Sequence, residues 1–173
     1  MHGTLYLILY LDMNICYLQL GSNLGDRKSM LMKALSLIEN MVGDVVVASG
    51  IYESSAWGVK DQSDFLNQVL KVQTTLSPHD LLEKILNIES IIGRKRIKKW
   101  GERLIDIDIL FYNNNVIHSQ TLVVPHPYLH KRRFVLLPLD EIASDYLHPQ
   151  CHKKISRLLM ECDDMEKVGK YVL

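Results

Sequence analysis

The sequence predicts an α+β protein of the ferredoxin-like class, with elements in the order β-α-β-β-α-β, one antiparallel sheet and two helices on one face. Two patterns lead to this prediction. Apolar residues recur with helical spacing in two segments, and short runs rich in Val, Ile and Leu flank each of them. The chain has 173 residues, which is the size of one domain. We therefore expect one α+β unit with a C-terminal elaboration.

The first half of the pattern occupies residues 14–51. A strand is expected at 14–20, and the turn that follows it at 21–26 is rich in residues that cap helices. This turn lacks the Lys-Ser/Thr ending of a phosphate-binding P-loop, so we interpret it as a capped strand-to-helix turn. A helix is then expected to about Met41, followed by a second strand at 45–51 and a loop at 53–58.

The second half repeats this order. A strand is expected at 65–75, and the next helix begins at Ser77 and Pro78, because proline suits the first turn, and ends at Gly93. The apolar run at 104–110 predicts the fourth strand of the pattern. After it the sequence indicates a shorter stretch at 116–124, a segment rich in proline and histidine, and a helix within 152–161.

We divide the chain into an N-terminal appendage, residues 1–12, and a single domain, residues 13–173. The apolar run at 5–11 is far shorter than the ~20 residues that span a bilayer, and it lacks the basic flank and cleavage site of a signal peptide. The three cysteines form no CxxC pair and no even disulfide set, which fits a reducing compartment. We therefore expect a cytoplasmic protein that does not bind membranes.

The charge balance argues against a sequence-independent nucleic-acid binder, because the formal net charge is zero. The cations are nevertheless concentrated: residues 94–103 contain six Lys or Arg and one Glu. A local positive cluster in a neutral protein suits a small anionic ligand better than a polymer. His148, Cys151 and His152 lack a second ligand pair at zinc-site spacing, so we do not predict a zinc site there.

Asp106 and Asp108 are separated by one residue within the isoleucine-rich run at 104–110. Side chains alternate between the two faces of a strand, so the isoleucines are expected to point into a core and both carboxylates to the other side. Two carboxylates on one face suit hard cations such as Mg²⁺, and the arginines just upstream suit phosphate. A solvated pair on an edge strand is the alternative. The upstream arginines favour a magnesium-dependent phosphoryl-transfer site.

The basic segment at 94–103 is expected to hold the phosphates. Its arginines offer planar forks to phosphate oxygens, and Trp100 offers a flat surface to a heterocycle. Neighbouring glycines indicate a segment that can close over a ligand. The alternative is a solvated basic loop.

A second group, Trp57, Phe65 and Asn67, combines aromatic rings with an amide. The two rings would also fit a core. The Asn67 amide offers both a donor and an acceptor to a ring with lactam and amine edges. This group therefore predicts a pocket for a heterocycle.

A third group lies in the proline- and histidine-rich segment. His126 and His130 have the spacing of helical metal ligands, but Pro127 disfavours a continuous helix and no zincin glutamate is present. We therefore interpret His126 together with Arg132 as further phosphate contacts.

With these residues in view, the sequence resembles the 6-hydroxymethyl-7,8-dihydropterin pyrophosphokinases of folate biosynthesis. The resemblance spans residues 15–155 and rests on five blocks in the family's order. These blocks are Gly21-Ser22-Asn23-Leu24-Gly25, Asp61-Gln62 with Phe65-Leu66-Asn67, Gly93-Arg94-x-Arg96 with Trp100-Gly101-x-Arg103, Asp106-x-Asp108, and Val124-Pro125-His126-Pro127 through Arg132-x-Phe134.

The resemblance implies an ATP- and Mg²⁺-dependent diphosphokinase that transfers pyrophosphate to the hydroxymethyl group of the dihydropterin and releases AMP. It implies catalytic roles for Arg94, Arg103, Asp106 and Asp108, with the two aspartates holding two Mg²⁺ ions. The ATP-binding residues that it implies are Glu89, Arg96, Ile109, His126 and Arg132. The pterin-binding residues that it implies are Ser54, Ser55, Trp57, Phe65, Asn67, Trp100 and Phe134.

Two other classes of protein remain open at this point: an RNA-binding domain, because such domains share this element order, and a regulatory ligand-binding domain without catalysis. Asp106 and Asp108 would repel RNA phosphates on the strand where RNA-binding domains stack bases. We therefore expect ATP and a dihydropterin as small-molecule partners, no nucleic acid, and a monomer.

Overall fold

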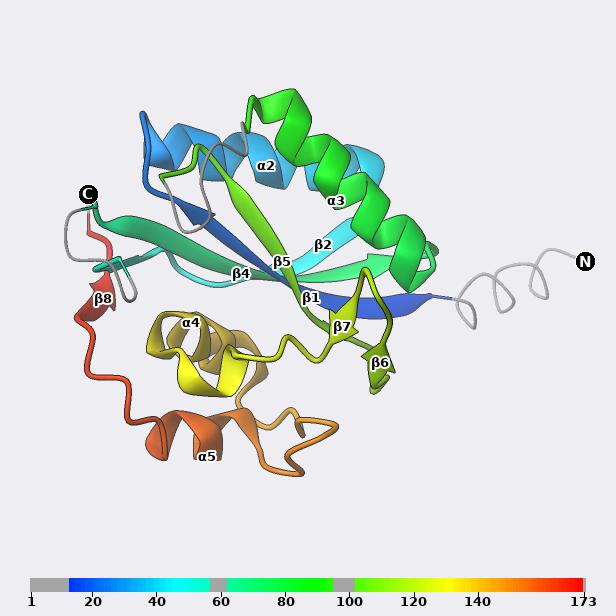
Figure 1. Ribbon diagram of the computed structural model, residues 1–173, viewed down its shortest axis with the longest axis vertical. Coiled ribbons are helices and arrows are strands. Elements are labelled where there is room, and N and C mark those ends of the chain that lie inside the picture. The colour runs from blue at the N-terminus through cyan, green and yellow to red at the C-terminus, as the bar shows by residue number, and fades with distance from the viewer. Residues whose placement is uncertain (1–12, 57–61, 95–101, 173) are drawn as a thin grey trace, which may run out of the picture.

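The computed structural model describes residues 13–56, 62–94 and 102–172. Helices lie on both faces of an antiparallel sheet, which gives a mixed α/β fold (Figure 1). In chain order the elements are β1 (Asn14–Ser22), α2 (Arg27–Met41), β2 (Asp44–Ala48), β3 (Tyr52–Ser54), β4 (Phe65–Thr74), α3 (Pro78–Ile92), β5 (Asp106–Tyr112), β6 (Ile117–His118), β7 (Val123–Val124), the 3-10 helix η1 (Leu129–Lys131), α4 (Arg133–Ala143), α5 (Ile155–Met160) and β8 (Val168–Lys170).

The main sheet has six strands, and its pairings among the described residues are antiparallel. Strands run in the order β5-β1-β4-β3-β8, and β2 also pairs with β4. Strand β3 lies along residues 65–67 of β4 and β2 along residues 70–73, so two short strands share one long neighbour. The long strands β1 and β4 therefore form the rigid centre of the sheet.

Each face of the sheet has its own apolar core. On β1, Cys16, Leu18 and Leu20 pack beneath α2 and α3. Tyr17 points to the opposite face, where it belongs to a second cluster that includes Leu136 of α4. Figure 1 shows α2 and α3 above the sheet and α4 and α5 below it. The alternation of β1 thus decides which side chains reach the face covered by α4.

The ends of α3 follow the sequence prediction. The Ser77 hydroxyl accepts the backbone N–H of Asp80 at 3.3 Å, and Pro78 occupies the first turn. Gly93 closes the helix with φ +105°, a left-handed conformation that favours glycine. Asp26 likewise caps α2 by accepting the N–H of Ser29 at 3.1 Å, as expected for a capped turn.

The strand predicted at 45–51 and the loop predicted at 53–58 are corrected by the structure. Strand β2 ends at Ala48, and β3 begins again at Tyr52. Ser49 explains the break, because its hydroxyl accepts the N–H of Val69 at 3.0 Å and donates to the Gly50 carbonyl at 2.8 Å. The Gly50 N–H in turn donates to a carboxylate oxygen of Glu141, at 3.2 Å, rather than to a strand.

The C-terminal elaboration contains more than was predicted. The stretch at 116–124 forms the two paired strands β6 and β7, and α5 lies within the expected range 152–161. Helix α4 and strand β8 were not predicted. Helix α4 contains Pro138, which is buried within it and disguises the helical pattern.

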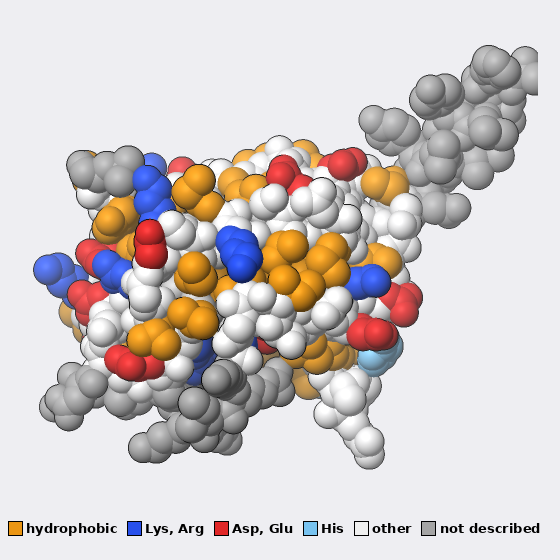
Figure 2. Space-filling model, turned by 90° about the horizontal axis from the view of Figure 1, so that it is seen from above, with side chains coloured by type: hydrophobic (Ala, Val, Ile, Leu, Met, Phe, Trp, Pro, Cys, Tyr) orange, Lys and Arg blue, Asp and Glu red, His pale blue; other side chains and the backbone are white. Residues whose placement is uncertain are grey.

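The outward surface of α2 and α3 carries apolar side chains among charges of both signs (Figure 2). Met32, Leu86 and Ile91 are exposed there. Mixed charges give this face no extended positive field of the kind that binds nucleic acid. No helix in the described part of the chain is long and apolar enough to cross a membrane.

Candidate active site

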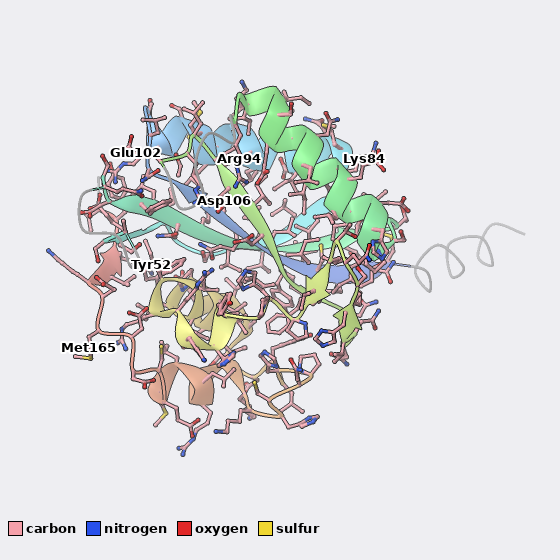
Figure 3. The ribbon with its side chains drawn as sticks, in the orientation of Figure 1. Tyr52, Lys84, Arg94, Glu102, Asp106 and Met165 are labelled. Atoms are coloured by element: carbon pink, nitrogen blue, oxygen red, sulfur yellow. The ribbon has the colours of Figure 1, made fainter. Side chains whose placement is uncertain are left out.

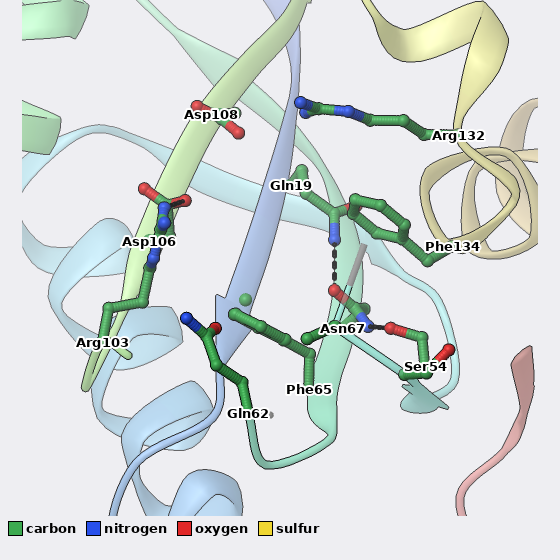
Figure 4. Close-up of a pocket in the computed structure, with 13 residues that line it drawn as sticks. Gln19, Ser54, Gln62, Phe65, Asn67, Arg103, Asp106, Asp108, Arg132 and Phe134 are labelled. Carbon is green, nitrogen blue, oxygen red and sulfur yellow. Dashed lines mark hydrogen bonds and ion pairs between the residues drawn. The ribbon is translucent and has the colours of Figure 1, made fainter. Parts of the chain in front are cut away.

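A pocket opens on the α4 side of the sheet, where β1 ends and β4 and β5 begin (Figure 4). Its wall combines carboxylates and arginines on one side with aromatic rings and amides on the other. The residues that line it are Gln19, Gly21, Ser54, Ser55, Ala56, Gln62, Phe65, Asn67, Arg103, Asp106, Asp108, Arg132 and Phe134.

The two aspartates project from β5 as the alternation predicts. Ile107 and Ile109 point into the core under α2 and α3, whereas Asp106 and Asp108 line the pocket on the other face. The sheet therefore fixes two carboxylates side by side, and Figure 4 shows both on the same strand facing the pocket. The expectation that they share one face is confirmed.

Asp106 is held between two arginines. Nη1 of Arg94 lies 2.6 Å from one carboxylate oxygen, and Arg103 pairs with the other. Arg94 comes directly after the end of α3, which brings it next to β5 (Figure 3). Arg103 lies in the segment just before β5, where its backbone N–H donates to Asn23 Oδ1 at 2.8 Å. Both arginines can turn to a phosphate group once Asp106 has another cation.

Glu89 supports this arrangement from below. Its side chain is buried in α3, pairs with Arg94, and accepts the backbone N–H of Ile107 at 2.8 Å. Burial raises its pKa despite the nearby Arg94. The structure therefore places Glu89 as a link between α3, Arg94 and β5 rather than on the pocket wall.

Asp108 lies two residues further along β5 and also lines the pocket. Desolvation raises its pKa to about 7, and the negative charge of Asp106 adds to the effect. Nε2 of His126 lies 3.9 Å from its carboxylate. The Asp108 carboxylate is therefore destabilised in its charged form until a cation approaches.

His126 contributes a neutral ring at this site. Burial and the nearby Arg132 lower its pKa to about 4. Its Nδ1 accepts the backbone N–H of Tyr128 at 3.3 Å, which assigns the ring proton to Nε2, the nitrogen that faces Asp108. A neutral donor of this kind suits a phosphate or carboxylate oxygen.

The other side of the pocket is aromatic. Phe65 begins β4 and Phe134 lies in the first turn of α4, and both rings project into the pocket. The Arg132 guanidinium lies 5.8 Å from the centre of the Phe134 ring. Two rings from separate elements bound a slot that suits a flat heterocycle.

A chain of hydrogen bonds lies along the floor of this slot. Asn67 Nδ2 donates to the Ser54 hydroxyl at 2.9 Å, and Asn67 Oδ1 accepts from Gln19 Nε2 at 3.2 Å. Ser55 stands at the rim, where its hydroxyl donates to Glu166 at 2.6 Å. The structure thus brings together five of the residues that the resemblance implies for pterin binding: Ser54, Ser55, Phe65, Asn67 and Phe134.

Several sequence-predicted residues do not reach the pocket or lie outside the described residues. Trp57, Arg96 and Trp100 belong to the latter group. The side chain of Ile109 packs in the core on the opposite face of β5, so only its backbone can approach a nucleotide.

Sequence reasoning missed Gln19 and did not assign a role to Gln62, yet both line the pocket. For Gln19 a signal was available. It is a polar residue between two apolar ones, Leu18 and Leu20, on a buried strand. The alternation of β1 directs its side chain to the face of the aspartates.

A cluster of His130, His148 and Cys151 lies apart from this pocket, with ligand atoms within 4.8 Å of one another. Nδ1 of His148 accepts the backbone N–H groups of Gln150 and Cys151, each at 3.1 Å. The ring proton is therefore on Nε2, whereas a metal ligand presents a lone pair there and donates through its other nitrogen. This tautomer disfavours a zinc site at these three residues.

Comparisons with known proteins point to one family. The family described as 7,8-dihydro-6-hydroxymethylpterin-pyrophosphokinase (HPPK) matches residues 17–144. The 2-amino-4-hydroxy-6-hydroxymethyldihydropteridine pyrophosphokinase of Aquifex aeolicus is 47% identical over 145 residues, covering 84% of this chain and 90% of that protein. The enzyme of the same name from Bacillus subtilis is 44% identical over 131 residues, covering 75% and 78%.

Solved structures agree on the fold. A crystal structure of HPPK-DHPS in complex with substrates matches 86% of this chain with a TM-score of 0.69 at 19% identity. The chain spans 43% of that longer protein.

Proposed function

Because this chain belongs to the 7,8-dihydro-6-hydroxymethylpterin-pyrophosphokinase family, we propose that it transfers pyrophosphate from ATP to the hydroxymethyl group of 6-hydroxymethyl-7,8-dihydropterin in folate biosynthesis. The hydroxymethyl oxygen bonds to the β-phosphorus of ATP, the bond from that phosphorus to the α–β bridging oxygen breaks, and AMP leaves while the hydroxyl loses its proton. The observation that carries this function is one pocket with a carboxylate pair at one side and an aromatic slot at the other.

Asp106 and Asp108 would hold Mg²⁺. They share one face of β5, and the raised pKa of Asp108 indicates a carboxylate that gains from a nearby cation. Bound magnesium would supply Lewis-acid neutralisation of the triphosphate. We propose two ions, which is the number that the family resemblance implies.

Arg94 and Arg103 act on the transferred group. In the ligand-free protein they neutralise Asp106, and a cation at Asp106 frees their forks for phosphate oxygens. Such chemistry depends on positioning and electrostatics, so the chain needs no covalent nucleophile. Glu89 fixes Arg94 and is a positioning residue.

Phe65 and Phe134 hold the pterin ring between them, with Asn67, Ser54 and Ser55 along its edge. Stacking fixes the plane of the ring and excludes water from the reacting oxygen. Trp57 and Trp100 are proposed for the same ligand from the family pattern alone.

On the nucleotide side we propose His126, Arg132 and Arg96 as direct contacts and Ile109 through its backbone. Glu89 acts on the nucleotide indirectly, through its pair with Arg94. A neutral Nε2–H at His126 and a charged Arg132 would both donate to phosphate oxygens.

We further propose the ferredoxin-like topology for the core, supported by the order β5-β1-β4-β2 of its four main strands. A single domain over residues 13–173, a monomer, and a reducing cytoplasmic setting complete the proposal. The three cysteines, none in a disulfide, support the setting.

The test is a turnover assay with purified protein, ATP, magnesium and dihydropterin. The expected product is AMP, formed only when pterin and magnesium are both present. ADP as product would indicate a single phosphoryl transfer, and absence of turnover together with RNA binding would favour the RNA-binding alternative.

We also expect the binding of the two substrates to be coupled. A non-cleavable ATP analogue should tighten pterin binding by roughly 1–3 kcal/mol.

A further inference from the structure

One side chain on the floor of the pocket has no role in the function described so far. Gln19 lies on β1 between two leucines that point into the core, and its own side chain faces the pocket with only 4% of the residue exposed. Figure 4 shows its amide between the Phe134 ring and Asn67. A buried amide at this place must find partners for both of its ends.

The amide orientation of Gln19 follows from its neighbours. Nε2 donates to the backbone carbonyl of Leu20 at 3.1 Å and to Asn67 Oδ1 at 3.2 Å. Asn67 Nδ2 donates in turn to the Ser54 hydroxyl at 2.9 Å and to the Tyr52 carbonyl at 3.5 Å. A flip of either amide would place an oxygen against a backbone carbonyl, which can only accept. Two carbonyls therefore lock both amides.

With both amides fixed in this way, one polar atom of Gln19 has no hydrogen-bond partner in the described part of the chain. Gln19 Oε1 is buried and has no hydrogen-bond partner among the residues described. An unsatisfied buried acceptor is costly, and such a group in a native protein calls for an explanation. The atom belongs to a residue that lines the slot between Phe65 and Phe134, where a ligand would lie.

We propose that Gln19 binds the pterin directly, with Oε1 accepting a hydrogen bond from an N–H on the edge of the heterocycle. This inference rests on the proposed function and adds a specificity-determining residue to it. The dihydropterin ring carries such donors at its 2-amino group, at N3 and at N8. A ring with a C–H or a lone pair at the same place would leave Oε1 unpaired, so Gln19 selects for the donor.

The experiment measures pterin binding by calorimetry in the presence of magnesium and α,β-methylene-ATP. Gln19→Leu removes the acceptor at nearly constant volume. We expect it to weaken dihydropterin binding roughly 5- to 150-fold, the range for an unpaired buried polar group. The affinity for the ATP analogue and the single-turnover rate at saturating pterin should stay within about twofold.

Three ligand analogues separate a direct contact from a general loosening of the pocket. One lacks the 2-amino group, one is methylated at N3, and one is the fully oxidised pterin, which lacks the N8 hydrogen. Wild-type protein should bind at least one of them more weakly than dihydropterin, and Gln19→Leu should lose that discrimination. Equal weakening of all four ligands by the substitution, or no weakening, would overturn the proposal.

Two controls keep the result decisive. Gln73→Leu makes the same change on β4 at the end of the sheet remote from the pocket, and it should leave all four affinities unchanged. If Gln19→Leu fails to fold, Gln19→Met serves as the test variant, because it also removes the acceptor. Wild-type protein that neither binds dihydropterin nor forms AMP would refute the proposed function itself, whereas normal wild-type binding with unaltered variants would refute only the role of Gln19.

Discussion

Asp108 gives the sharpest quantitative prediction, because its pKa is about 7 in the metal-free protein. A carboxyl group with this pKa is about 90% protonated at pH 6 and about 10% at pH 8. A metal ligand must be deprotonated, so binding of magnesium with nucleotide should displace that proton. The expected release is therefore most of one proton per protein at pH 6 and much less at pH 8.

Calorimetry in two buffers of different ionisation enthalpy measures the protons released. The titrant is α,β-methylene-ATP saturated with magnesium, which cannot be cleaved at the bond that breaks in the reaction. Asp108→Asn cannot titrate, and its release at pH 6 gives the contribution of the ligand alone. Equal proton release by wild-type and variant protein at pH 6, despite binding in both, would refute the assignment of Asp108 as a metal ligand with a raised pKa.

The same group sets the sign of a stability effect. Since the folded pKa of Asp108 lies above its ordinary value of 3.8, the folded state binds the proton more tightly than the unfolded state. Metal-free protein should therefore lose part of its stability as pH rises from about 4 to about 7. Urea unfolding should show a smaller loss over this range in Asp108→Asn, and an equal loss would contradict the raised pKa.

Three further substitutions probe separate parts of the site. Asp106→Asn should slow turnover at saturating magnesium by at least about 100-fold, because loss of a metal ligand costs several kcal/mol. Circular dichroism should show that the fold persists, and near-normal turnover would exclude the metal role. Glu89→Gln retains an acceptor for the Ile107 N–H but breaks the buried pair with Arg94. Urea unfolding should therefore show a loss of about 1–3 kcal/mol in the free energy of unfolding. An unchanged urea midpoint would speak against a positioning role. Phe134→Ala should raise the pterin dissociation constant about tenfold or more and leave ATP binding unchanged, a pattern that a general loss of structure would not give.

The parts of the site that the sequence predicts are those set by local periodicity and capping. Alternation along β5 is enough to put Asp106 and Asp108 on one face, because a strand buried on the other face tolerates no slip. Ser77 and Gly93 mark both ends of α3, and Arg94 follows at once. These features need no knowledge of distant residues.

The parts that the sequence misses depend on partners far along the chain. Strands β3 and β8 have three residues each, too few to show a pattern in the sequence. They form because β3 pairs with β4 on one side and with β8 on the other. Helix α4 forms in spite of Pro138 because its apolar face covers the second core. Alternation along β1 directs Gln19 to the face of the aspartates, but its hydrogen bond to Asn67, a neighbour 48 positions away, depends on the pairing of β1 with β4.

The last strand has a practical consequence for the design of fusion proteins. Strand β8 pairs with β3, and the carbonyl of Lys167 accepts the backbone N–H of Ser55 at the pocket rim. The start of β8 thus lies beside the substrate entrance, and the strand runs from there away from the rim, so that the N–H of Tyr171 donates to the Ile51 carbonyl. Strand β1 begins roughly 25–30 Å from Ser22, at the other end of the sheet. Figure 1 shows the start of β1 and strand β8 at opposite sides of the molecule. A reporter or affinity handle that pulls on β8 would strain the pairing that holds Ser55 at the rim, so kinetic work is better done with the handle joined ahead of β1.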